Sequence, residues 1–279
     1  MLKVHSETAN GCVACRKGSG LGFELTMAFQ PIVDAQRRSV FAYEALVRGI
    51  GGLSAAQVLS MVNEENRYAF DQTCRVKAIE LAARLGIAER GAKLSVNFMP
   101  GAVYSPAACI RRTLQAATFH RFPLDAIIFE ITEGERVQDT AHLQGIAAEY
   151  ARHGFTLALD DFGAGFSGLN LLSELEGIRL LKLDGALIRG IENNDRAQRI
   201  VRSMVLLCDG LGIKVLAECV ETAAEYTSLR ECGIELMQGY LFARPELEQL
   251  PAIQWPDAAQ STSFELGDTA RNEQVPVSA

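Results

Sequence analysis

The sequence predicts an α/β fold, a (β/α)8 TIM-like barrel with an antiparallel first strand. Eight apolar runs of strand length recur along the 279 residues, and helical patterns separate the runs after the second one. The centres of the runs lack polar alternation, which is typical of strands covered on both faces. The runs occupy residues 27–33, 40–47, 94–97, 127–131, 156–159, 180–183, 214–217 and 236–240. A doubly wound open sheet is the alternative arrangement for the same pattern.

The connection between the first two runs predicts the reversed strand. Residues 33–39 are too few for a helical crossover and are mostly polar. Two strands joined by so short a segment pair as an antiparallel hairpin, because parallel strands need a longer crossover.

Helix boundaries carry the second group of signals. Ser54 with Gln57, and Thr222 with Glu225, fit the capping box that opens a helix. At five helix ends a glycine is followed by an apolar residue, which is the pattern of a left-handed C-terminal cap. These glycines are Gly86, Gly154, Gly177, Gly212 and Gly233. Each joint leads towards the next strand, which favours repeated αβ units.

The composition is that of an ordinary globular protein, with 48% hydrophobic and 22% charged residues. A net charge of −7 argues against a DNA or RNA polymer as partner. No apolar run reaches the ~20 residues of a membrane span, and the N-terminus lacks the apolar core of a signal peptide. We therefore expect no membrane insertion and a cytoplasmic location.

Three segments are expected along the chain. Residues 1–22 form a glycine-rich N-terminal arm, residues 23–250 form the barrel domain, and residues 251–279 form a polar C-terminal tail. The seven cysteines suit a reducing compartment. Cys12 and Cys15 form a lone C-x-x-C with only His5 nearby, so we expect an exposed thiol pair. A metal or redox role shared with a partner chain is the alternative.

Polar side chains stand near the C-terminal ends of seven successive runs. They are Glu44, Asn97, Glu130, Asp160 with Asp161, Lys182, Glu218 and Gln238. In a barrel these ends converge on one face, where active sites are built. Carboxylates gathered in one cleft repel each other unless positive charge lies among them. The oxygen-rich set predicts Mg²⁺ or Mn²⁺ as that charge.

The adjacent carboxylates of Asp160 and Asp161 can face two metal ions. Paired metals activate water and hold a phosphodiester for in-line displacement. Lys182 adds a fixed positive charge for the attacking water or a phosphate oxygen. This set indicates phosphodiester hydrolysis without a covalent intermediate.

Residues 163–168 also fit the dinucleotide-binding pattern G-x-G-x-x-G, with Asp184 about 20 residues further on. Asp160 and Asp161 would then face a pyrophosphate, and residues 169–176 are short for a crossover helix. A loop without a ligand role, or a mobile active-site loop beside the acid pair, fits the segment better.

The ordered motifs resemble the EAL-domain phosphodiesterases of bacterial cyclic di-GMP signalling. Residues 44–48, Glu-Ala-Leu-Val-Arg, match the name-giving motif, and Gln-Pro-Ile-Val precedes it at 30–33. The remaining motifs, in the family's order, are Ser-Val-Asn at 95–97, Glu-Ile-Thr-Glu at 130–133, Asp-Asp-Phe-Gly-Ala-Gly at 160–165, Leu-Lys-Leu-Asp at 181–184, Ala-Glu-Cys-Val-Glu at 217–221 and Gln-Gly-Tyr at 238–240. The resemblance covers about residues 26–247.

The resemblance implies hydrolysis of cyclic di-GMP to the linear dinucleotide pGpG by a two-metal, water-activating mechanism. The ligands of one Mg²⁺ or Mn²⁺ ion would be Glu44, Asn97, Glu130 and Asp160. The ligands of the second would be Asp160, Asp161 and Glu218. Lys182 would orient the bridging water, and Gln238 would support the water and the metal site.

The same resemblance assigns substrate contacts to Gln30, Leu46, Arg48 and Asp184. Glu133 would anchor the glycine-rich loop, which in the family lies next to the dimer contact, so a homodimer is expected. Two positions depart from the family pattern. Cys219 stands where glycine is usual, and we expect neutral packing there, while Glu235 stands where aspartate is common.

Three functions remain in competition. The first is an active cyclic di-GMP phosphodiesterase. The second is a non-catalytic cyclic di-GMP receptor that acts through protein partners, although such a receptor need not retain five mutually repelling acids. The third is an interaction module that works through the Cys12–Cys15 arm. The sequence shows no sensor domain of its own, which leaves a separate sensor protein as a candidate partner.

Overall fold

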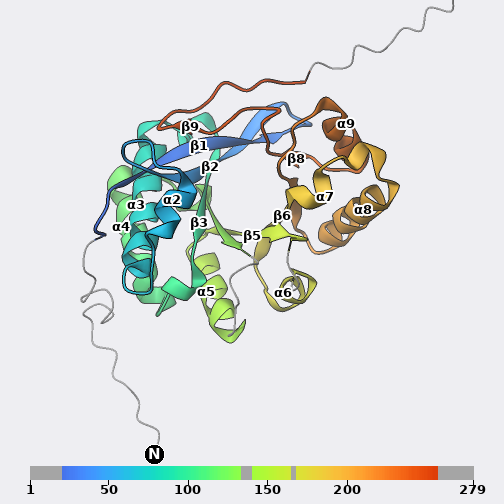
Figure 1. Ribbon diagram of the computed structural model, residues 1–279. Coiled ribbons are helices and arrows are strands. Elements are labelled where there is room, and N and C mark those ends of the chain that lie inside the picture. The colour runs from blue at the N-terminus through green and yellow to red at the C-terminus, as the bar shows by residue number, and fades with distance from the viewer. Residues whose placement is uncertain (1–20, 133–139, 165–167, 257–279) are drawn as a thin grey trace, which may run out of the picture.

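The computed structural model describes residues 21–132, 140–164 and 168–256. Eight strands close into a barrel, and helices surround it (Figure 1). The strands are β1 Leu25–Asp34, β2 Ser39–Gly49, β3 Lys93–Phe98, β4 Ile127–Thr132, β5 Thr156–Phe162, β6 Ile178–Leu183, β7 Lys214–Ala217 and β8 Leu236–Met237. β1 is antiparallel to both neighbours, β2 and β8, and the other barrel pairs are parallel. The predicted barrel and its reversed first strand are confirmed.

The helices fill the connections between strands. They are α2 Ala55–Ser60, α3 Arg67–Arg84, α4 Pro106–His120, α5 Thr140–Arg152, α6 Gly168–Glu174, α7 Gly185–Ile188, α8 Asp195–Gly210 and α9 Ala223–Glu231. Short 3₁₀ turns lie at Ala88–Arg90, Pro100–Ala102, Leu124–Ala126 and Ile191–Asn193. The two predicted capping boxes open α2 and α9. Within the ranges described above, no helix combines the length and apolar character needed to cross a bilayer.

The predicted glycine joints adopt the left-handed conformation that only glycine reaches without cost. All five have positive φ, from 67° at Gly86 to 93° at Gly177 and Gly233. After Gly86 the N–H of Ile87 donates to the carbonyl oxygen of Ala82 at 3.1 Å. This bond satisfies a carbonyl at the end of α3 and turns the chain back towards β3.

Side chains alternate between the two faces of each strand, so every second residue points into the barrel. These inward-pointing side chains form two layers. The first, which we call the apolar plug, consists of Ile32, Ala42, Ile128, Ala158, Leu180, Leu216 and Leu236. Two residues further along the strands lies a second layer, which we call the charged layer. It consists of Gln30, Glu44, Glu130, Asp160, Lys182, Glu218 and Gln238. In the reversed β1 the step runs backwards, from Ile32 to Gln30.

The last strand and the segment after it differ from the prediction. β8 ends at Met237 instead of continuing to residue 240, because the chain then bends around Val220. A Cβ on Gly239 would lie 2.0 Å from the Val220 carbonyl oxygen, so only glycine fits this approach. A short strand that the sequence did not signal, β9 Glu246–Leu247, pairs with β1 beyond the end of β8.

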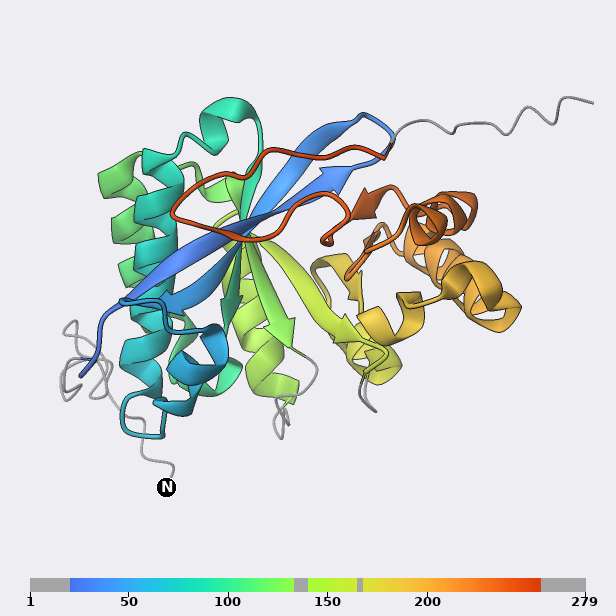
Figure 2. The ribbon, with the colours of Figure 1, turned by 45° about the horizontal axis from the view of Figure 1, so that its top comes forward.

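The C-terminal part of the described chain crosses over β1 and β2 (Figure 2). The N–H of Gln254 donates to the Phe242 carbonyl oxygen at 2.8 Å. The Trp255 ring packs on Phe242, and the guanidinium of Arg38 lies over the Trp255 ring. Cys12, Cys15 and most of the predicted arm and tail lie outside the described residues, so the segment boundaries stay predictions.

Candidate active site

The ammonium group of Lys182 lies at the centre of the charged layer. Its Nζ is 2.8 Å from Glu130 Oε2, 2.9 Å from Asp160 Oδ1 and 2.8 Å from Glu218 Oε1. Glu44 Oε1 is farther away, at 3.9 Å. Lys182 is 1% exposed and Glu130 is fully buried, so water hydrates neither charge well. The two charges instead compensate each other directly. Four carboxylates predicted from strand ends thus converge on one cation.

Amide side chains hold the carboxylate of Glu44 from two sides. Asn97 Nδ2 donates to Oε1 at 2.8 Å, and Gln238 Nε2 donates to Oε2 at 2.9 Å. Gln30 lies beside Gln238, with its Oε1 3.4 Å from Gln238 Nε2. These contacts fix the orientation of the Glu44 carboxylate before any ligand arrives.

Sequence reasoning missed Ser95, a fully buried hydroxyl that donates to Glu130 Oε1 at 2.6 Å. A signal was available in the sequence. Ser95 lies two residues before Asn97 in the same strand, so the period of two places both side chains on the inner face. A polar residue at that position of a buried strand indicates a partner inside the barrel.

An irregularity in β5 lets two successive aspartates face the same site. Leu159 pairs with Leu181 and Phe162 with Leu183, so two residues of β5, Asp160 and Asp161, stand opposite the single Lys182. Asp161 has φ of 56°, the left-handed conformation that accompanies such a bulge. In a regular strand the two side chains would point to opposite faces.

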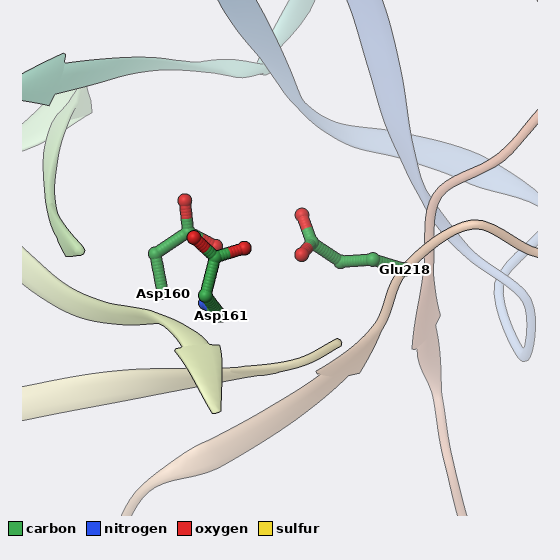
Figure 3. Close-up of side chains that lie close together, drawn as sticks. All are labelled: Asp160, Asp161 and Glu218. Carbon is green, nitrogen blue, oxygen red and sulfur yellow. The ribbon is translucent and has the colours of Figure 1, made fainter. Parts of the chain in front are cut away.

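The bulge gathers three carboxylates into one group. Ligand oxygens of Asp160, Asp161 and Glu218 all lie within 4.8 Å of one another. Figure 3 shows the two aspartates extending from the end of β5 and Glu218 reaching towards them from beyond β7. Hard, all-oxygen donors in this arrangement suit a divalent cation such as Mg²⁺ or Mn²⁺.

Burial and repulsion from neighbouring carboxylates raise the pKa values of Glu130, Asp161 and Glu218. Burial raises the pKa of Glu218 to about 8 in spite of the nearby Lys182. Burial also raises the pKa of Glu130 well above its usual range, and it raises the pKa of Asp161 with repulsion from Asp160 as the next cause. Burial alone would lower the pKa of Lys182, but attraction to the surrounding carboxylates raises it well above the ordinary value. The ammonium of Lys182 therefore stays charged, while Glu130, Asp161 and Glu218 hold protons more tightly than ordinary acids do.

Cys219 follows Glu218 in a conformation that costs a cysteine energy. Its φ is 56°, in the region that favours glycine. A Cβ on Gly185 would lie 2.8 Å from Cys219 Cβ, so the two positions constrain each other. The Cys219 side chain is exposed at this turn, and partial desolvation raises the pKa of its thiol.

Two cavities flank the group of three carboxylates. One, of about 570 Å³, is lined mainly by apolar side chains and opens beside Asn97, Asp160 and Asp161. The other, of about 240 Å³, is polar and lies beside Glu44, Asp161 and Glu218. Predicted substrate residues line both: Leu46 the larger, and Gln30 with Asp184 the smaller.

The remaining predicted residues are less closely tied to this centre. Asp184 caps α7, accepting from the Ala186 N–H at 2.8 Å. Arg48 lies on the same face of β2 as Glu44 and Leu46, and its Nη1 donates to the Val47 carbonyl oxygen at 2.7 Å. Glu133 lies outside the described residues, as does part of the predicted glycine-rich loop, so both stay predictions.

Comparison with known proteins identifies relatives of this chain. The family model described as "EAL domain" matches residues 19–245. The chain is 30% identical over 230 residues to the blue light- and temperature-regulated antirepressor BluF of Escherichia coli, covering 82% of this chain and 56% of that protein. It is 34% identical over 171 residues to the cyclic di-GMP phosphodiesterase RocR of Pseudomonas aeruginosa, covering 61% of this chain and 43% of that protein. The chain thus spans about half the length of these relatives.

Two solved structures share the fold. A standalone EAL protein from Vibrio cholerae, in its c-di-GMP bound form, has a TM-score of 0.80 and 50% identity, and the match covers 84% of this chain and 98% of that one. A manganese and cyclic di-GMP complex of Klebsiella pneumoniae BlrP1 has a TM-score of 0.78 and 33% identity, covering 85% and 60% of the two chains.

Proposed function

The chain belongs to the EAL domain family, and on that premise we propose that it hydrolyses cyclic di-GMP to the linear dinucleotide pGpG with two divalent metal ions. The observation that carries the proposal is the charged layer with its added Asp161. Five members of the layer line one of the two cavities, and Asp161 lines both. Such a concentration of buried, mutually perturbed ionisable groups is typical of a catalytic site.

The charge of the layer supports two metal ions. Five carboxylates and one ammonium, when all are ionised, leave four negative charges, which two divalent cations would balance. Glu44, Asn97, Glu130 and Asp160 would hold one ion. Asp160, Asp161 and Glu218, whose oxygens lie within 4.8 Å of one another, would hold the second. When bound, such ions supply Lewis acidity towards water and the phosphodiester.

The protein's own groups place the reactants. Lys182, fixed by Glu130, Asp160 and Glu218, holds its ammonium where an attacking water oxygen needs a positive partner. Gln238 steadies Glu44 and lines the smaller cavity. No side-chain nucleophile is required, because the carboxylates can accept the protons that water releases.

The two cavities suit a substrate with two nucleobases joined by phosphodiesters. The larger cavity, with Leu46, Phe70 and Met99 on its wall, would receive one guanine by apolar contact. Gln30 and Asp184 line the smaller cavity and provide polar groups for the second half of the molecule. Arg48, on the same strand as Glu44, would add a further substrate contact. The bond to be cleaved would then lie over the carboxylates between the cavities.

The proposal includes a homodimer in the cytoplasm, and it leaves the input signal to a separate sensor protein. The dimer rests on the resemblance described above. Light scattering at micromolar concentration should report twice the mass of one chain, and a monomer with full activity would contradict it.

The decisive test is product analysis. Purified protein should convert cyclic di-GMP to pGpG with Mn²⁺ or Mg²⁺ and should stop when a chelator is added, as chromatography can show. Asp161→Asn should lose the activity, whereas Asp195→Asn, the same change at an exposed position in the first turn of α8, should keep it. Binding of cyclic di-GMP without turnover would favour the receptor function instead, which the similarity to an antirepressor makes the competing candidate.

A further inference from the structure

A buried cation lies outside the barrel, directly behind the proposed metal site. Arg75 of α3 is 0% exposed, and its guanidinium contacts residues of two helices and two strands. Its Nη2 lies 2.8 Å from Asp71 Oδ2, one turn earlier on the same helix. Its Nη1 donates to the hydroxyl of Tyr150 on α5 at 2.6 Å.

The guanidinium also lies over aromatic rings of two barrel strands. It is 5.1 Å from the ring centre of Phe98 on β3 and 5.2 Å from that of Phe129 on β4. The Phe98, Phe129 and Tyr150 rings contact one another around it, with centroids 4.9–5.8 Å apart. The cation therefore occupies an aromatic cage that joins both strands to two helices.

The strand residues in this cage are immediate neighbours of proposed metal ligands. Phe98 follows Asn97, and Phe129 precedes Glu130. Because alternate side chains face opposite sides, each phenylalanine points outwards while its neighbour points into the barrel. Asn97 and Glu130 are register partners in β3 and β4. The cage therefore packs against the outer face of the two strands at the point where these two proposed ligands stand.

Asp71 also binds the backbone just after β3. Its Oδ1 accepts the N–H of Met99 at 3.0 Å, two residues after Asn97. The side chain of Asn97 is exposed in the cavity, and its one described hydrogen bond goes to Glu44. Its position therefore depends on the backbone on which it stands, and Asp71 and Arg75 fix that backbone.

We propose that Arg75 and Asp71 are positioning residues that set the placement of the metal ligands Asn97 and Glu130 from outside the barrel. The inference rests on the proposed function for the identity of those ligands. Its physical basis is the cost of burying a guanidinium, which an apolar side chain of similar volume would avoid. A planar cation can stack on rings of two strands and at the same time bond a carboxylate and a hydroxyl, and no apolar side chain can do this.

The test measures Mn²⁺ binding without substrate, by the loss of the free-ion signal in electron paramagnetic resonance. Arg75→Met, which keeps the volume but removes the charge, should bind Mn²⁺ about tenfold more weakly than wild type. Its hydrolysis at low Mn²⁺ should fall by a similar factor and should recover at saturating Mn²⁺. Val201→Ala is the control, because it removes fully buried methyl groups in α8, on the far side of the barrel (Figure 1). It should lower the melting temperature and leave Mn²⁺ affinity within twofold of wild type.

Tyr150→Phe is the second variant, used if Arg75→Met does not fold. It removes only the hydroxyl that accepts from Arg75 and should weaken Mn²⁺ binding by a smaller factor. A folded variant of either kind that binds Mn²⁺ as tightly as wild type would overturn the positioning role. Wild-type protein that binds Mn²⁺ but does not cleave cyclic di-GMP would refute the proposed function and leave the positioning role standing.

Discussion

The apolar plug and the charged layer occupy the same barrel, on the same strands, two residues apart. In β6 the change runs from Leu180, packed in the plug, to Lys182, surrounded by carboxylates. In β4 it runs from Ile128 to Glu130. Both layers are buried, so the difference between them is chemical: one gains free energy on folding by leaving water, and the other loses hydration that must be compensated.

Because of this difference, the apolar plug stabilises the barrel and the charged layer forms the candidate site. The plug can stabilise the closed barrel without any partner. Burying the charged layer costs hydration free energy. Lys182, which lies among the carboxylates, offsets this cost, and so do Asn97, Gln238 and Ser95, which donate hydrogen bonds to the carboxylate oxygens. Four substitutions and one pH comparison test this division, and they follow in order of expected effect.

Asp160→Asn should produce the largest change in activity and almost none in stability. It removes the proposed shared metal ligand, so hydrolysis should fall by about a thousandfold. An asparagine oxygen can still accept from the Asp161 N–H, now at 2.9 Å, so the metal-free protein should melt within about 2 °C of wild type. Melting curves in chelator and in Mn²⁺ would check both parts. A variant that melts far below wild type in chelator would make Asp160 a structural residue.

Lys182→Met should remove the positive charge that compensates the carboxylates of the charged layer and should lower the stability of the metal-free protein. Four carboxylates would lose their common cation, and removing one partner of a buried ion pair costs about 3–5 kcal/mol. Chemical denaturation in chelator would measure the loss, and added Mn²⁺ should restore part of it. If the variant is as stable as wild type without metal, the ammonium is not the internal counter-ion of the site.

Leu180→Ala, two residues before Lys182 on the same strand, should lower stability and leave activity almost unchanged, which is the opposite of the result expected for Asp160→Asn. Truncating a leucine with 1% exposure costs about 3 kcal/mol of unfolding free energy through lost burial and a cavity. The charged layer keeps its ion pairs, so kcat/KM per folded molecule should change little. Activity lost without a stability change would show that plug and site are not separable.

The pH dependence of the metal-free protein sharpens the comparison, because the charged layer holds titratable groups and the apolar plug holds none. Burial raises the pKa of Glu218 to about 8, whereas a glutamate in the unfolded chain titrates near about 4.3. Between these values the folded protein keeps a proton that the unfolded chain has released, so stability falls as pH rises. The pKa of Lys182, raised above its usual value, adds no slope in this window because the amine is protonated in both states.

Melting temperatures in chelator should therefore be higher at pH 6 than at pH 8, with a slope of at most ~1.4 kcal/mol per pH unit for each proton. Mn²⁺ should reduce or reverse the difference, since the ion takes the place of the protons. A metal-free melting temperature that rises from pH 6 to pH 8 would contradict the raised pKa.

Cys219→Gly should have the smallest effect. Glycine adopts the φ of 56° at this turn without strain. Glycine also loses more conformational freedom on folding, so the net rise in melting temperature should be only about 2 °C. Differential scanning calorimetry would measure it, and a lower melting temperature would show that the thiol contributes favourable packing.

The sequence alone was enough for the barrel because its signals are local and repeated. The C-terminal caps at Gly86 and Gly233 and the boxes at Ser54 and Thr222 each depend on residues a few positions apart. The strand-end acids could be collected in one place because the fold class itself brings strand ends together. β9 could not be predicted, since two exposed residues carry no period and only β1 gives them a partner.

The finer geometry of the site depends on contacts that are distant in the sequence. The bulge at Asp160 and Asp161 has no sequence marker, because aspartate is not a residue that demands positive φ. The pairing of Asp71 with Met99, and the Arg75 contact with Tyr150, join segments that only the fold brings together. Ser95 is the exception, since the period of two in β3 pointed to it.

The reversal of β1 also decides where the polypeptide enters the molecule. Leu25 pairs with Gly49, at the end of β2 that carries Arg48 beyond the charged layer. A parallel first strand of the same ten residues would place that entry about 30 Å away, at the closed end of the barrel. A module joined upstream of residue 25 would therefore meet the barrel at the rim of the proposed active site, on the strand that carries Gln30.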